Sequence, residues 1–189
     1  MALQQLAASS RKLNQLVVDL LDVDRLSRGI VEPQLSPTDV SELVLRVVEE
    51  TPVGDRRVDL DVVPARAEVD ASKVERIVEN LLSNAAKYTP PGTPITVRVR
   101  PEDHGVYLIV EDAGPGVPDD LKAAIFRAFA RGTAAQLHSP GVGIGLSLVA
   151  QFAEMHGGRA WVEDRPGGGS SFKVYLPAVE RTPEESLSA

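Results

Sequence analysis

The stretch Val74–Gly92, VERIVENLLSNAAKYTPPG, decides how the rest of the chain is interpreted. Its apolar residues recur every three or four positions, which predicts an amphipathic helix that ends at Pro-Pro-Gly. Asn80, Asn84 and Lys87 lie at i, i+4 and i+7, so they share the face opposite the apolar stripe. Periodicity alone allows two interpretations of this face: a solvated helix surface, or one wall of a binding site.

The side chains on this face suit a phosphate-bearing ligand. Asparagine carbonyl oxygens are suitable ligands for Mg²⁺, which keeps several waters and bridges phosphates. Lys87 can neutralise a phosphate, and Tyr88 can border a base or a ribose. The same residues on a surface helix would simply be solvated.

The composition is that of a globular protein. The chain has 189 residues, of which 43% are hydrophobic and 25% charged, enough for one domain of about 150 residues and an appendage. The net charge of −7 argues against a nucleic-acid partner, but backbone amides can still bind phosphate. The chain contains no cysteine, which excludes disulfides and thiolate metal sites and fits a reducing compartment.

The sequence contains no segment that predicts a membrane span or a signal peptide. No apolar run approaches the roughly 18 residues that a transmembrane helix needs. The N-terminus lacks the charged-then-apolar layout of a signal peptide. We expect a cytoplasmic chain, and a longer membrane-anchored parent remains open.

The N-terminal part predicts an appendage. Residues Ala2–Ser27 read as one helix in which Leu6, Leu13 and Leu20 recur every seven residues, a spacing that favours a partner helix outside this chain over a surface helix. The segment that follows this helix, residues 29–37, has two prolines and is predicted to be a linker. We divide the chain into this helix (1–28), the linker (29–37), a catalytic region (38–178) and a flexible tail (179–189).

The catalytic region mixes helices and strands without strict βαβ alternation. A capping box at Ser72 and Glu75 predicts the start of the helix that ends at Pro-Pro-Gly. We therefore predict an α+β fold: a two-layer sandwich with a mixed sheet and helices on one face. The other predicted helices are Asp39–Glu50, Asp119–Ala130 and Leu146–Met155; the predicted strands are Val58–Val62, Ala67–Val69, Ile95–Arg100, Val106–Glu111, Arg159–Glu163 and Ser171–Leu176.

Three glycine-bearing segments follow the asparagine-bearing helix. VEDAGPGVP (Val110–Pro118) places Asp112 at a strand end, where its carboxylate can accept a hydrogen bond from an exocyclic amine. PGVGIGLSLV (Pro140–Val149) leads directly into a helix start, an arrangement typical of an anion site, although a flexible hinge would have the same pattern. GGGSSF (Gly167–Phe172) alone predicts a hairpin turn.

The order of these motifs resembles the ATP-binding catalytic domain of sensor histidine kinases, within the superfamily shared with gyrase, MutL and the ninety-kilodalton chaperones. The resemblance covers about residues 38–177. Val74–Gly92 is similar to the family's N box, and Val110–Pro118 to its first glycine box. IFRAFARG (Ile125–Gly132) is similar to its F box, and Gly141–Val149 to its second glycine box.

The resemblance implies roles for the polar residues of the helix. Asn84 would be the principal Mg²⁺ ligand and Asn80 would assist it. Lys87 and Tyr88 would contact phosphate and nucleoside. The implied cofactors are ATP and Mg²⁺.

The resemblance also implies roles in the glycine segments. Asp112 would accept the adenine amine, Arg131 would reach the γ-phosphate and act in catalysis with the two asparagines, and Gly132–Pro140 would be a mobile lid anchored by Phe126 and Phe129. The remaining nucleotide contacts would be Gly114, Gly116, Gly141, Val142, Gly143, Ile144, Gly145, Leu146 and Ser170.

Three positions depart from the family pattern. Arg127 stands where the F box commonly has Glu, Ile144 replaces a frequent Leu, and Ser170 stands where Thr is usual. The change at Arg127 puts the behaviour of the lid in doubt, while ATP binding remains expected.

None of the three histidines fits a phosphoacceptor, because none is followed by Glu. We expect His104 in an exposed turn, His138 in the lid, and His156 in a structural role as a cation at a helix end. The segment Arg11–Val44 resembles the second helix of the family's dimerisation and phosphotransfer hairpin and its junction with the catalytic domain. We therefore expect this chain to be either a piece of a longer kinase or a split kinase that acts on a partner.

The resemblance implies a γ-phosphate transfer to a histidine on a hairpin outside this chain, a response regulator receiver domain as partner, and a homodimeric parent. The alternatives are an ATPase switch module, an anti-sigma-type serine kinase that sequesters a partner, and a degenerate pseudokinase. Related ATPases carry Glu at the position of Asn80 to activate water. Because an amide cannot do this, we expect weak or no ATP hydrolysis.

Overall fold

The computed structural model describes residues 17–18, 21, 32–102, 104–128 and 143–177. A five-stranded sheet in the order β2-β4-β5-β7-β6 forms its centre, with β2 parallel to β4 and the other neighbours antiparallel. A separate two-stranded sheet pairs β1 with β3. The strands are β1 (Ser36–Asp39), β2 (Val58–Val62), β3 (Arg66–Val69), β4 (Ile95–Glu102), β5 (Gly105–Asp112), β6 (Arg159–Asp164) and β7 (Ser170–Pro177).

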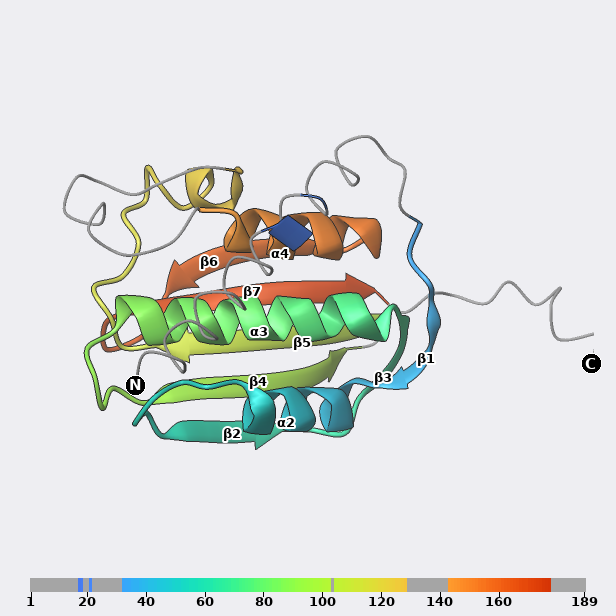
Figure 1. The fold of residues 1–189 in the computed structure, drawn as a ribbon, viewed down its shortest axis with the longest axis horizontal. Coiled ribbons are helices and arrows are strands. Elements are labelled where there is room, and N and C mark those ends of the chain that lie inside the picture. The colour runs from blue at the N-terminus through green and yellow to red at the C-terminus, as the bar shows by residue number, and fades with distance from the viewer. Residues whose placement is uncertain (1–16, 19–20, 22–31, 103, 129–142, 178–189) are drawn as a thin grey trace, which may run out of the picture.

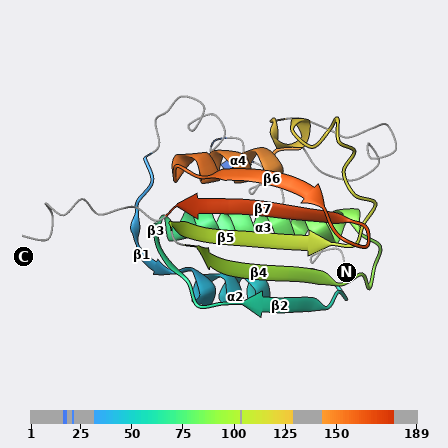
Figure 2. The ribbon, with the colours of Figure 1, turned by 180° about the vertical axis from the view of Figure 1, so that it is seen from behind.

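The helices form a second layer on one face of the large sheet. They are α2 (Val40–Glu50), α3 (Ala71–Tyr88) and α4 (Gly145–Met155), with a short 3₁₀ turn, η1 (Ala124–Phe126). Figure 1 shows α2 and α3 in front of the strands, and the reverse view in Figure 2 shows the strands in front of these helices. The predicted mixed α+β architecture is confirmed.

The apolar stripes predicted for the helices form the core between the layers. The α3 residues Ile77, Leu81 and Leu82 are almost completely buried, as are Phe152 of α4 and Ile95 of β4. Valine, leucine, isoleucine and alanine supply nearly all of the remaining core, as the low aromatic content requires. This packing fixes the rotation of α3 about its axis, and therefore the direction of its polar face.

Side-chain caps set the starts of α2 and α3. Asp39 caps α2 by accepting the Glu42 amide. The prediction that Ser72 caps α3 is wrong. The cap is Asp70, whose Oδ1 accepts the Lys73 amide at 3.3 Å, while the Ser72 hydroxyl donates to the same carboxylate.

Asp70 also connects α3 to the segment before β1. Its Oδ2 accepts the Gln34 amide at 3.1 Å. Although burial alone would raise it, the pKa of Asp70 is held below its ordinary value by hydrogen bonds from Ser72 and from the Gln34 and Lys73 amides. A carboxylate with a lowered pKa stays ionised, so it remains an acceptor at neutral pH.

The predicted helix Asp119–Ala130 is wrong over its described part. Residues 119–123 form turns, and only η1 follows. Two kinds of backbone hydrogen bond compete there: Leu121 donates to Pro118 at i−3, whereas Ile125 donates to Leu121 at i−4. Phe126 packs edge-on against Phe172 with ring centroids 6.4 Å apart, so tertiary packing overrides the helical pattern.

The N-terminal predictions are only partly within the described residues. The predicted linker 29–37 overlaps β1, whose Ser36 pairs with Val69 of β3; a strand of 4 residues is too short to show alternation. Val17, Val18 and Leu21 are helical, and the rest of the predicted helix Ala2–Ser27 lies outside the described residues, as does the tail 179–189. No helix in the described ranges has the length and apolarity to cross a bilayer.

Candidate functional site

The polar face of α3 is not a fully solvated surface. Asn80, Asn84 and Lys87 are each half-buried, and Tyr88, the last helical residue, is 38% exposed. Asn80 lies where α3 faces the start of α4. The two ends of this face are contacted by two of the three glycine segments.

Asn80 is held between α3 and α4. Its Nδ2 donates to the Arg76 carbonyl at 2.8 Å, which leaves Oδ1 as the free end of the amide. This oxygen lies so close to Gly145 that a Cβ on Gly145 would be 2.7 Å from it. Only glycine permits this approach, so the second glycine segment and the helix face are brought together as predicted.

Among the described residues, no side chain caps the start of α4. Ile144 occupies the N-cap position, makes no side-chain capping bond and is itself buried. The Ser147 hydroxyl does not cap either, because it donates to the Ile144 carbonyl at 2.7 Å. The first-turn amides of α4, from Gly145 to Ser147, thus carry the positive helix end without a side-chain capping acceptor from the described residues. An anion beside Asn80 would complete them.

Asp112 ends β5 and is only 5% exposed. Its Oδ1 accepts the Gly114 amide at 2.8 Å. Burial raises the pKa of this carboxyl, while hydrogen bonds from the Gly114 and Ser170 amides and the charge of Arg165 oppose the shift. A desolvated carboxylate of this kind gains from a ligand that brings a hydrogen-bond donor.

The first glycine segment packs against the end of α3. A Cβ on Gly114 would lie 2.8 Å from Asp112 Oδ1 and 3.2 Å from the Tyr88 carbonyl, so this close approach requires glycine. Gly116 follows with φ of 76°. Ser170 begins β7 directly opposite Asp112 in the strand register, and it is buried. The structure therefore brings Asp112, Gly114 and Ser170 together beside Tyr88.

Lys87 and Tyr88 act as a pair at the exit of α3. The Lys87 ammonium donates to the Tyr88 hydroxyl at 2.8 Å and lies 4.4 Å from the centre of its ring. Sequence reasoning missed the residue that holds this exit. Arg56 donates to the Thr89 hydroxyl at 3.1 Å and to the Thr89 carbonyl at 2.7 Å. The prolines after Thr89 signal a need for such a donor, but nothing in the sequence identifies Arg56 as its source.

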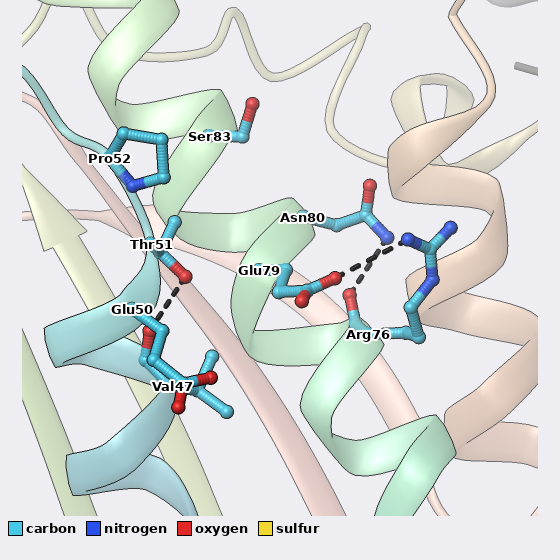
Figure 3. A pocket seen from close by; sticks show the side chains of 8 residues that line it. All are labelled: Val47, Glu50, Thr51, Pro52, Arg76, Glu79, Asn80 and Ser83. Carbon is cyan, nitrogen blue, oxygen red and sulfur yellow. Dashed lines mark hydrogen bonds and ion pairs between the residues drawn. The ribbon is translucent and has the colours of Figure 1, made fainter. Parts of the chain in front are cut away.

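A pocket of about 270 Å³ lies between the end of α2 and the middle of α3. In Figure 3, Asn80 and Arg76 extend to one side of α3, and the α2 residues lie on the other. The pocket is lined by eight residues: Val47, Glu50, Thr51, Pro52, Arg76, Glu79, Asn80 and Ser83. Of the predicted site residues it includes only Asn80, so it is not the assembled predicted site.

Several predicted site residues lie outside the described ranges: Arg131, Gly141 and Val142, together with the lid Gly132–Pro140 and Phe129. Gly143 and Leu146 are described, and Leu146 is half-buried in the first turn of α4. Phe126 packs against the core, as expected of a lid anchor, whereas Arg127 is exposed.

The histidines differ from one another in environment. His104 is exposed, as predicted, and its carbonyl accepts the Tyr175 hydroxyl at 2.7 Å. His138 lies outside the described residues. His156 is structural, as expected, but the prediction of a cation is wrong. Its Nε2 accepts the Asp70 amide at 3.0 Å, and its Nδ1 lies 2.6 Å from the Phe152 carbonyl, so the ring is the neutral Nδ1–H tautomer.

Together, the contacts define a strip along α3 with different chemistry at each end. The Asp112 turn contacts one end at Tyr88, and the start of α4 contacts the other at Asn80. Eight helical positions separate these two residues, about 12 Å at 1.5 Å per residue. No group of three or more His, Cys, Asp or Glu in the described part of the chain could hold a metal.

Comparison with known proteins gives one family. Residues 69–180, more than half of the chain, match the family described as histidine kinase-, DNA gyrase B- and HSP90-like ATPase. The signal transduction histidine-protein kinase/phosphatase MprB of Mycolicibacterium paratuberculosis is 39% identical over 93% of this chain and 34% of its own length. The chain spans well under half of the length of the curated relatives that it matches.

Two solved structures are similar to the described fold. The mycobacterial sensor histidine kinase MprB superposes with a TM-score of 0.67 at 32% identity, over 76% of this chain and 97% of that one. Full-length ShkA in complex with AMPPNP superposes with a TM-score of 0.76 at 28% identity, over 91% of this chain and 37% of ShkA.

Proposed function

The chain belongs to the histidine kinase-, DNA gyrase B- and HSP90-like ATPase family, and we propose that it is the ATP-binding catalytic domain of a two-component sensor histidine kinase. Its similarity to MprB along most of its length favours the histidine kinase branch of the family. In this proposal the strip along α3 binds ATP, with the base at the Asp112 end and the phosphates at the α4 end.

The base end suits adenine. Asp112 is buried and carries a raised pKa because it is desolvated, so an exocyclic amine that donates to it would relieve an unfavourable environment. Gly114 lets the turn approach the end of α3 closely, and Gly116 and Ser170 complete the turn around Asp112. Tyr88 would border the nucleoside and Lys87 the phosphates.

The phosphate end suits a triphosphate with a divalent cation. The uncapped amides at the start of α4 are donors for phosphate oxygens, and Gly143, Ile144, Gly145 and Leu146 form this start. Bound Mg²⁺ would neutralise the phosphate oxygens. Asn80 fits such a site, because its Nδ2 is occupied by the Arg76 carbonyl and its Oδ1 faces the start of α4. We assign Asn84 as the principal ligand and Asn80 as its helper.

Catalysis in this proposal is mainly positioning. The chain would hold the γ-phosphate in line with an imidazole nitrogen supplied by another segment. No general base is required, since a neutral imidazole is already nucleophilic. Arg131, Gly141 and Val142 are proposed to contact the phosphates, and the lid Gly132–Pro140 to close over them.

The proposed partners lie outside the catalytic region. We infer that residues 1–28 are the second helix of a dimerisation and phosphotransfer hairpin and that residues 29–37 connect it to the catalytic region. The phosphoacceptor histidine would be on the other helix, in the same parent chain or its dimer mate. A response regulator receiver domain would then accept the phosphate. The catalytic region would act in the cytoplasm as part of a parent protein that is anchored in the membrane.

The observation that carries the proposal is the pair of contacts on α3. One glycine segment meets the helix at Tyr88 and another at Asn80, about 12 Å apart. An extended nucleoside triphosphate has a comparable length. A helix face that is merely solvated would not require contacts from glycine segments at both ends with Asn84 between them.

The test is phosphotransfer in trans. The chain is mixed with labelled ATP, Mg²⁺ and a separate hairpin that carries a phosphoacceptor histidine. We expect acid-labile label on the hairpin, lost in Asn84→Ala and retained in the control Glu75→Ala. Glu75 lies on the same helix but pairs with Arg46 away from the proposed strip. Acid-stable label on serine would instead favour the anti-sigma-type kinase, and absence of nucleotide binding would refute the proposal.

A further inference from the structure

The Thr89 amide closes the last turn of α3 by donating to the Ala85 carbonyl at 3.2 Å, and the next two residues cannot extend this pattern. The carbonyls of Ala86 and Lys87 would take their i+4 amides from residues 90 and 91, which are both proline and have no N–H. The next amide, that of Gly92, donates to Asp55 at 3.3 Å instead. Lys87 and Tyr88, the two residues proposed to contact the nucleotide at this end, therefore lie in a last turn that the backbone closes through the Thr89 amide and not through residues 90 and 91.

Arg56, in the loop between α2 and β2, donates hydrogen bonds to Thr89, the residue that follows the last turn of α3. Its Nε and Nη2 donate to the hydroxyl and the carbonyl of Thr89, at 3.1 and 2.7 Å. Its Nη1 donates to the Val53 carbonyl at 3.1 Å, which ties the guanidinium to its own loop. All three nitrogens are thus engaged, two of them on one residue, an arrangement that a planar guanidinium can make and an ammonium cannot.

Thr89 passes this restraint on to the adenine end of the site. It is 6% exposed, and its hydroxyl donates to the Ala85 carbonyl at 2.7 Å while accepting from Arg56. Its Cγ2 faces Gly114, at 3.2 Å from the position of a Cβ there. Thr89 therefore lies between Arg56 and the Asp112–Gly116 turn, in contact with both.

We propose that Arg56 is a positioning residue that fixes the exit of α3 against the Asp112–Gly116 turn. Arg56 touches neither Asp112 nor the strip itself; it acts through Thr89. Because the Lys87 ammonium is bonded to the Tyr88 hydroxyl, these two side chains follow the helix exit as a unit. The consequence for nucleotide affinity rests on the function proposed above, whereas the coupling between the two segments does not.

Two measurements on the full chain test the proposal. Calorimetry with AMPPNP and Mg²⁺ should give a dissociation constant about tenfold higher for Arg56→Ala, as expected for losing hydrogen bonds from a charged donor. Arg56→Lys should bind with intermediate affinity, and Thr89→Val, which keeps a methyl group towards Gly114, about threefold more weakly than the unchanged chain. The matched control is Arg57→Ala. Arg57 is 77% exposed, pairs with Asp59 and should bind within about twofold.

Amide exchange without nucleotide gives the second readout. The Gly114 amide is held by Asp112 Oδ1, and it should exchange faster in Arg56→Ala than in Arg57→Ala. A purely structural role would lower the melting temperature and leave both the affinity and the Gly114 exchange of the folded protein unchanged, which would overturn the proposal. If Arg56→Ala does not fold, Arg56→Lys and Thr89→Val decide by the same two readouts.

The two proposals can fail separately. If the unchanged chain binds no AMPPNP, the proposed function fails, and faster Gly114 exchange in Arg56→Ala still supports the positioning role. If the unchanged chain binds AMPPNP and the Arg56 and Thr89 variants match it in affinity and exchange, the positioning role fails while the proposed function stands.

Discussion

Replacing Gly145 by alanine should slow phosphotransfer by about a hundredfold while leaving stability almost unchanged. The new Cβ would lie 2.7 Å from Asn80 Oδ1, closer than a real Cβ contact allows, so the Asn80 side chain must rotate away. Rotation breaks the hydrogen bond from Asn80 Nδ2 to the Arg76 carbonyl, which is 2.8 Å long. The substitution therefore displaces a proposed catalytic side chain without removing it.

Two effects of Gly145→Ala on stability oppose each other and are of similar size. Alanine is favoured over glycine within a helix by about 1 kcal/mol, and Gly145 is the first residue of α4. Losing the hydrogen bond made by Asn80 costs about 1 kcal/mol. The free energy of unfolding should consequently change by less than about 1 kcal/mol. A misplaced positioning group, in contrast, can lower the rate of transfer by about a hundredfold.

The assay compares Gly145→Ala with Gly157→Ala at the other end of α4. Gly157 has φ of 74°, so alanine there should destabilise the fold by about 1 kcal/mol without changing phosphotransfer. Urea unfolding and transfer to the histidine hairpin are measured for both. A normal rate of phosphotransfer in Gly145→Ala, or a loss of more than about 3 kcal/mol of stability, would contradict this role of the Asn80–Gly145 contact.

Three further predictions concern single buried or helical residues. Because burial raises the pKa of Asp112 above its ordinary 3.8, this carboxyl favours the folded state at pH below 3.8 and loses that contribution as pH rises through the raised pKa. Asp112→Asn, which stays neutral, should be more stable than the unchanged chain at pH 7 by thermal unfolding, and this difference in stability should shrink towards acid pH. The variant should also bind AMPPNP about tenfold more weakly. Equal affinity would argue against adenine binding at this end. Asn80→Glu should raise ATP hydrolysis at least about tenfold by supplying a base, and unchanged turnover in a phosphate-release assay would contradict this. His156→Phe should lower the free energy of unfolding by roughly 1–3 kcal/mol, because the Asp70 amide loses its acceptor; a urea midpoint equal to that of the unchanged chain would remove this role.

Much of the fold could be predicted because the apolar patterns are long and regular. The apolar stripe of α3 and the alternation in β4 determine which face of each element is buried. The glycine segments also occur in a recognisable order. The failures are local competitions that periodicity does not resolve. Asp70 takes the N-cap position from Ser72 because its carboxylate can accept several donors at once, from Gln34, Ser72 and Lys73.

The site could be predicted only in outline. Sequence order places Asn80 and Gly145 in one site, but their contact depends on how α3 packs against α4. Likewise, the neutral state of His156 follows from the Asp70 amide, a partner 86 positions away along the chain. Arg56 could not be predicted, because the loop that carries it has no periodicity and its acceptors are on the far end of α3.

The most direct test of the central claim is a crystal structure of this chain with AMPPNP and Mg²⁺. In that structure the adenine amine should lie within hydrogen-bond distance of Asp112, the phosphates at the amides of Gly145 and Leu146, and Mg²⁺ should be bound to Asn84. A nucleotide bound elsewhere, for example in the pocket between α2 and α3, or no bound nucleotide at saturating concentration, would contradict it.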